Sequence, residues 1–153
     1  MNRRKQIELT PEERTAFVKN ALTIHLCSNG PHGYPHIVPM WFMVDGDGAV
    51  WMTTYRKSQK ILNLKRDPKV ALLVESGVTY DTLKGVLIRG EAAVIDDQDT
   101  CVRVLMGIHE KTAGSFPEGI GDALRMQARK RVAIKVTPKH FASWDHSKLG
   151  GVY

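Results

Sequence analysis

Residues 53–60 carry the side chains best suited to chemistry. The stretch reads Thr53-Thr54-Tyr55-Arg56-Lys57-Ser58-Gln59-Lys60, at the end of a strand-like run and the start of a short helical pattern. A helix N-terminus offers free backbone N–H groups and the positive end of the helix dipole, which favour an anion. Lys57 and Lys60 flank this start, and the Ser58 hydroxyl can donate. The stretch suits a phosphate, although an ordinary capped helix with solvated lysines has the same spacing.

The local charge also favours an acidic ligand. Six basic residues and one acid, Asp67, lie between Arg56 and Lys69, and the chain carries a formal net charge of +6. This is more positive charge than a single phosphate needs. A solvated helix face accounts for the same residues without any ligand, so charge alone leaves both interpretations open.

The elements that position this stretch follow from hydrophobic patterning and turn residues. Strands are expected at 22–28, 35–44, 49–55, 69–75, 84–95 and 132–137, with a hairpin turn at 45–48. Helices are expected from Pro11 to about Asn20 and in a short segment that begins after Ser58. Two more are expected, one that begins after Asp97 and one from the loop at 114–119 to about Lys130. About six antiparallel strands with late helices predict one mainly β domain, a closed or nearly closed barrel with peripheral helices.

Length and composition narrow the classes of protein. A chain of 153 residues suits one domain over residues 1–153, with residues 1–9 expected to be flexible and 143–153 an irregular tail. No segment has the apolar length of a membrane span, and the charged N-terminus is unlike a secretory signal. Cys27 and Cys101 form neither a disulfide framework nor a zinc pattern, so we expect no metal and a cytoplasmic location.

Several motifs together resemble the pyridoxamine 5′-phosphate oxidase-like split barrel. They are the run His36-Ile37-Val38-Pro39-Met40-Trp41-Phe42, the stretch 53–60, a helix ending at Asp67-Pro68 and the strand Val70-Ala71-Leu72-Leu73-Val74. The resemblance covers roughly residues 10 to 145. That superfamily includes FMN-dependent oxidases and reductases, and reductases that use the deazaflavin coenzyme F-420.

The resemblance implies a cofactor site at the interface of a homodimer. The strand residues Val38, Pro39, Met40, Trp41 and Phe42 would lie along the flavin or deazaflavin ring. Thr53 and Thr54 would contact the ribityl chain, and Lys57, Ser58 and Lys60, with Arg56 beside them, would hold the phosphate. Trp144 is a candidate for the wall that the second subunit contributes.

The reaction is less determined than the cofactor class. Flavins and deazaflavins carry the hydride themselves, so few catalytic side chains are expected and none is assigned. The basic excess favours coenzyme F-420 over FMN, with hydride transfer to a conjugated small molecule; an FMN oxidase or reductase and a cofactor carrier remain alternatives. Trp41, Trp51 and His36 could serve the site, or be ordinary strand residues. Nucleic-acid binding is disfavoured, because the aromatic residues lie mostly in apolar runs.

Overall fold

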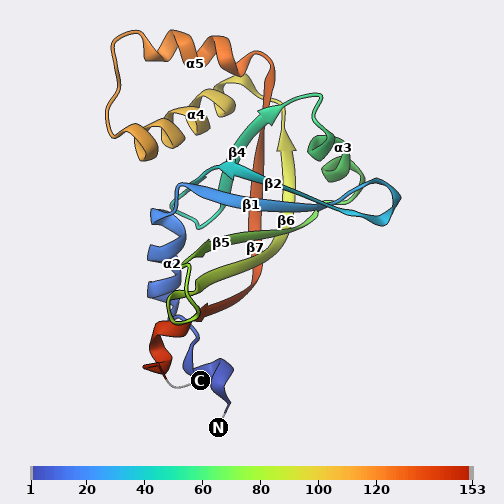
Figure 1. Cartoon of the computed structure of the whole chain (residues 1–153). Helices are drawn as coiled ribbons and strands as arrows, with labels where there is room; N and C mark the ends of the chain where they lie inside the picture. Colours follow the sequence, from blue (N-terminus) through green and yellow to red (C-terminus); the bar gives the residue numbers. More distant parts are fainter. Residues whose placement is uncertain (1, 152–153) are drawn as a thin grey trace.

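The computed structural model describes residues 2–151, and an antiparallel sheet of seven strands forms its centre (Figure 1). The strands are β1 (Thr23–Asn29), β2 (Pro35–Trp41), β3 (Met43–Val44), β4 (Val50–Tyr55), β5 (Lys69–Ser76), β6 (Lys84–Ile95) and β7 (Arg131–Asp145). Their order across the sheet is β2-β1-β5-β6-β7-β4-β3. The mainly β fold with peripheral helices is confirmed.

The sheet curls because its two edge strands are consecutive in the chain. β2 and β3 lie at opposite ends of the strand order, yet only Phe42 separates them. Phe42 is fully buried. The chain steps from one edge of the sheet to the other within one residue, so the edges must come close. This step makes the sheet a split barrel rather than an open layer.

One expected strand is divided. The run 35–44 was predicted as a single strand paired through the hairpin with 49–55, but it breaks at Phe42. Pro35–Trp41 pairs with β1, and only Met43 and Val44 pair with β4. The count is therefore seven strands instead of about six. The bend was hidden in the sequence because every residue near it is apolar.

Helices lie around the barrel in three places. α2 (Pro11–Asn20) begins with the predicted capping box of Thr10 and Glu13. α3 (Gln59–Arg66) follows β4. α4 (Gln98–Ala113) and α5 (Ile120–Ala128) form a pair beyond β4, at one end of the molecule in Figure 1. Short helical turns α1 (Arg3–Gln6), η1 (Pro31–Gly33), η2 (Tyr80–Thr82) and η3 (His146–Leu149) complete the chain.

Residues near both ends of the described chain contact the sheet. The backbone N–H of Asp145 donates to the Ile7 carbonyl at 2.7 Å, and the Leu9 N–H donates to the Ser143 hydroxyl at 3.1 Å. The expected flexibility of residues 1–9 stays a prediction. The tail 143–153 needs correction, because its first three residues complete β7 and the next four form η3. Met1, Val152 and Tyr153 lie outside the described residues.

Two hydrophobic clusters stabilise the fold. The larger fills the barrel with inward side chains such as Ile24, Leu26, Met52 and Leu72. The smaller lies between the opposite face of β4 and the α4–α5 pair, and includes Trp51 and Val104. β4 is thus covered on both faces, which explains why five of its six residues are buried.

Candidate functional site

A groove of about 350 Å³ runs between β2 and the end of β4 on one side and the α4–α5 pair on the other. We call it the β4–α4 groove. Six of the twelve residues expected to bind a cofactor line it, and they come from β2, β4 and α3: Pro39, Met40, Trp41, Thr53, Thr54 and Lys60. The volume is within the range of small-molecule sites.

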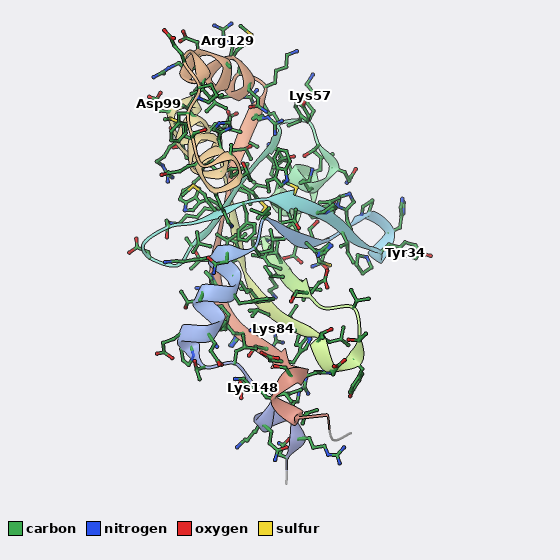
Figure 2. The ribbon with its side chains drawn as sticks, turned by 60° about the vertical axis from the view of Figure 1, so that its left-hand side comes forward. Tyr34, Lys57, Lys84, Asp99, Arg129 and Lys148 are labelled. Atoms are coloured by element: carbon green, nitrogen blue, oxygen red, sulfur yellow. The ribbon has the colours of Figure 1, made fainter. Side chains whose placement is uncertain are left out.

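The other six expected residues do not line the groove. Val38 packs against the barrel core, and Phe42 is fully buried within it. Lys57 is exposed, and Figure 2 shows it extending outward from the turn after β4. Ser58 makes no helix-capping hydrogen bond; its Oγ lies 3.4 Å from the Thr54 hydroxyl. Arg56 and Trp144 make the contacts described below.

Lys60 projects from the first turn of α3 back toward β4. Its Nζ donates a 2.9 Å hydrogen bond to the Thr54 hydroxyl, and Thr54 is buried. Burial lowers the pKa of Lys60, and the nearby positive charge of Arg131 lowers it further. A cation that is partly desolvated and faces another cation is stabilised by an anion placed between them.

Arg56 is engaged in a structural contact. Its guanidinium donates two hydrogen bonds to Asp96, from Nη2 to Oδ1 at 2.7 Å and from Nε to Oδ2 at 2.9 Å. A third, from Nη1, reaches the Arg129 carbonyl at 3.2 Å. These bonds join the end of β4 to the segments that begin α4 and end α5. These contacts compete with the role at a phosphate that the sequence predicts for Arg56.

Sequence reasoning missed the far wall of the groove. This wall comes from α4, α5 and the ends of β4 and β7, and comprises Leu105, Ile108, His109, Thr112, Leu124, Gln127, Tyr55 and Arg131. The apolar stripe on α4 was visible as a 3.6-residue period. What the period cannot give is the strand against which the helix packs, so the helix pair was not assigned to the site.

His109 ties this wall to the loop between the two helices. Its Nε2 lies 3.1 Å from the Ser115 carbonyl, and its ring lies 5.6 Å from that of Phe116. Because a carbonyl only accepts hydrogen bonds, Nε2 carries the proton. The imidazole therefore donates from Nε2 to the loop between α4 and α5, and it also lines the groove.

The two strand tryptophans have different environments. Trp51 is buried, its Nε1 donates a 2.7 Å hydrogen bond to Asp45, and Arg103 stacks on its ring at 4.4 Å. It belongs to the core under α4. Trp41 is 65% exposed on the outer face of β2. The Nδ1 of His36 is buried without a hydrogen-bond partner in the described part of the chain.

The outer face of the sheet carries several exposed or half-buried apolar side chains. Ile37, Pro39 and Trp41 are exposed on β2. A row of half-buried residues continues from Pro39 across the neighbouring strands, with His25, Leu73, Leu87 and Ala142 in register. Trp144 lies on this face, where its ring covers Gly85 so closely that a Cβ there would be 2.3 Å from Cζ2. Exposed apolar area of this kind marks interaction surfaces.

Two classes of feature are not found. Within residues 2–151, no helix is long and apolar enough to cross a bilayer. Over the same residues, no group of three or more His, Cys, Asp or Glu side chains is placed to hold a metal ion.

The curled antiparallel sheet, the edge strand beside a groove and the lysine-bearing helix after β4 define a split-barrel protein. The chain belongs to the pyridoxamine 5′-phosphate oxidase family, whose sequence profile, described as "Pyridoxamine 5'-phosphate oxidase", matches residues 10–145. The family suggested by the sequence motifs is therefore confirmed.

Solved structures with the same fold belong to proteins of different kinds. A conserved hypothetical protein from Mycobacterium tuberculosis is 36% identical, with a TM-score of 0.90 over 98% of this chain and 93% of that one. An F420 reductase is 27% identical, with a TM-score of 0.67 over 87% and 98%. A haem storage protein from Vibrio cholerae, 16% identical with a TM-score of 0.67 over 90% and 97%, shares the fold alone. The comparison with curated proteins found no match.

Proposed function

We propose that this protein is an oxidoreductase that transfers a hydride from reduced coenzyme F-420 to a conjugated small molecule. The observation that carries the proposal is the β4–α4 groove, which has a cationic end at Lys60 and an apolar end at Met40, Trp41 and Ile108. A phosphorylated ring cofactor has the same polarity along its length. The similarity to an F420 reductase at 27% identity supports the choice of cofactor class.

The residues present fit such a group. β2 is an edge strand, so the side of its backbone that faces away from β1 has N–H and C=O groups outside any ladder. Of the adjacent residues Met40 and Trp41, one directs its N–H and C=O toward β1 and the other directs them away, where they can hydrogen-bond the polar edge of a ring. Thr53 and Thr54 lie between them and Lys60, where hydroxyls suit a ribityl chain. No acidic residue lines the groove in the described chain, so nothing there repels an anion.

The protein's contribution is binding, orientation and exclusion of water. When bound, the deazaflavin supplies the hydride chemistry itself. The α4–α5 pair covers one side of the groove with Leu105, Ile108 and Leu124, which keep water from the ring. We assign no side chain as a proton donor.

We further propose that the working form is a homodimer. The apolar outer face of β1, β2, β5, β6 and β7 offers a continuous surface for a second copy. Trp144 and Trp41 both belong to this face, and Pro39 and Trp41 also line the groove. A second copy docked here would lie beside the groove and could complete its wall with Trp144.

The charge favours F-420 over FMN. The phosphodiester and glutamate tail of F-420 carries several negative charges, while Lys60 and Arg131 line the groove and the chain has a net charge of +6. FMN presents one phosphate and would use only part of this surface. Lys57 is exposed in the turn three positions before Lys60, and it would contact the acidic tail of F-420.

Titration of the purified protein with F-420 and with FMN, followed by tryptophan fluorescence, tests the proposal. We expect micromolar binding of F-420 and weaker binding of FMN, followed by turnover of the reduced coenzyme with conjugated acceptors. Tighter binding of FMN would reassign the cofactor. Binding of F-420 without turnover on any acceptor would indicate a carrier, and binding of neither would overturn the proposed function.

A further inference from the structure

Arg131 is the one groove residue whose charged group lacks a polar partner. It is the first residue of β7 and pairs in register with Tyr55 of β4. Its guanidinium carbon lies 4.6 Å from the centre of the Tyr55 ring, and its Nε is buried without a hydrogen-bond partner in the described chain. A buried donor of this kind is costly unless a ligand or water satisfies it.

The position of Arg131 is fixed by its backbone. The Arg131 carbonyl accepts from Arg56 Nη2 at 3.4 Å and from Cys101 Sγ at 3.6 Å. The ring of Tyr55 supports one face of the guanidinium. The side chain is therefore held in place beside the groove, and its planar donors are free to bind an anion by two parallel hydrogen bonds.

Lys60 supplies the second cation at the same end. It reaches the groove from α3, while Arg131 reaches it from β7, and both line it beside Tyr55. The two charges repel each other, since Arg131 contributes to lowering the pKa of Lys60. Neither forms an ion pair with an acid in residues 2–151. Two unneutralised cations facing one groove are stabilised when an anion lies between them.

We propose that Arg131 and Lys60 together form the phosphate-binding site of this groove, with Arg131 as the contact that gives the phosphate its orientation. The proposal rests on the proposed cofactor function and makes it more specific. It transfers the main phosphate contact from the exposed Lys57 to a half-buried arginine from a different strand. The ligand class is a ring compound with a phosphate monoester or diester on a short polar chain.

Paired ligands with and without the phosphate test this assignment. The variants are Arg131→Gln and, as matched control, Arg129→Gln, which removes the same charge from a neighbouring residue that does not line the groove; Figure 2 shows Arg129 at the helix pair. Binding of F-420 is compared with that of the deazaflavin riboside lacking the phosphodiester, and FMN with riboflavin. Arg131→Lys reports whether the planar guanidinium is needed.

We expect Arg131→Gln to weaken binding of the phosphorylated ligands about 10-fold or more and to leave the phosphate-free ligands within about 2-fold. Arg129→Gln should change neither, and Arg131→Lys should recover part of the loss. Equal weakening of both members of each pair would show a merely structural role for Arg131 and overturn the assignment. An equal effect of Arg129→Gln would also overturn it, because general charge would then suffice.

The assignment can also be tested if the cofactor proposal fails. If the wild-type protein binds none of the four ligands, inorganic pyrophosphate is titrated while backbone amide NMR signals are recorded. Shifts centred on residues 54–60 and 131 that vanish in Arg131→Gln would support the anion site without the cofactor. The absence of such shifts, or their persistence in Arg131→Gln, would overturn it.

Discussion

The guanidinium of Arg56 and the carboxylate of Asp96 form a two-point contact, with Nη2–Oδ1 at 2.7 Å and Nε–Oδ2 at 2.9 Å. The pair links the end of β4 to the residue before the N-cap of α4. It lowers the pKa of Asp96 chiefly through the hydrogen bond from Arg56. Arg56 therefore has a structural use that competes with the phosphate role expected from the sequence.

Replacing Arg56 tests which use prevails. We expect Arg56→Gln to leave the affinity for F-420 and FMN within about 2-fold, because Asp96 holds the guanidinium. Asp96→Asn should likewise have little effect. Fluorescence titration of both variants is the measurement. A clear loss with Arg56→Gln together with tighter binding in Asp96→Asn would show that Arg56 leaves Asp96 for the phosphate.

Lys60 and Lys57 should differ sharply in their effect on binding, although they are only three positions apart. Lys60 lines the groove and donates to Thr54, whereas Lys57 is exposed. Lys60→Gln is expected to weaken binding of the phosphorylated coenzyme by about 10-fold, and Lys57→Gln by about 3-fold or less at moderate salt. Isothermal titration calorimetry measures both. Equal losses would mean that Lys57, in the turn before α3, also contacts the ligand.

Lys111 should give a specific pH dependence of stability. It lies over the Phe42 ring at 3.5 Å and donates to the Phe42 carbonyl at 3.3 Å, and burial lowers its pKa from 10.5 to about 8. Between pH 8 and 10.5 the unfolded state binds more protons at this residue than the folded state. The contribution of Lys111 to the free energy of unfolding therefore rises with pH in that range.

Comparison with Lys111→Met isolates that contribution. Urea unfolding of both proteins at pH 7, 8, 9 and 10 is the measurement, since effects of other groups cancel in the difference. The wild type should gain stability relative to Lys111→Met as the pH rises. A difference that stays constant with pH, or changes in the opposite direction, would show that Lys111 titrates normally.

Gly85 should tolerate no side chain while Trp144 covers it. A Cβ at this position would lie 2.3 Å from the indole Cζ2, so Gly85→Ala must displace the ring. We expect a loss of about 1–3 kcal/mol in unfolding free energy and a shift in tryptophan emission. Trp144→Phe in the Gly85→Ala background offers a smaller ring and should recover part of the loss. Unchanged emission in Gly85→Ala would contradict this packing.

The proposed dimer surface includes Trp41 as well as Trp144, and Trp41 allows a test of the dimer. Trp41→Glu places a charge on the exposed outer face of β2 without altering the core. We expect it to convert a dimer to monomers in analytical ultracentrifugation, because an unpaired charge cannot be buried at an apolar interface. Lys57→Glu, a surface change away from that face, should leave the mass unaltered. A monomeric wild type would contradict the dimer proposal.

The sequence by itself determined the fold and the local elements. The mostly apolar run at 84–95 placed β6 without error, and the Thr10–Glu13 capping box placed the start of α2. These signals are local, since apolar strand runs and helix caps depend on residues a few positions apart. The motifs from 36 to 74 also gave the family, and with it the expectation of a phosphate site near Lys60.

Only the tertiary structure decided which residues share the groove. Arg131 is 71 positions from Lys60, and no local pattern relates them; they meet because β7 pairs with β4 and α3 folds back on the end of β4. The break at Phe42 and the packing of α4 against β4 have the same origin. Contacts between distant segments depend on how the sheet curls and closes, which periodicity does not record.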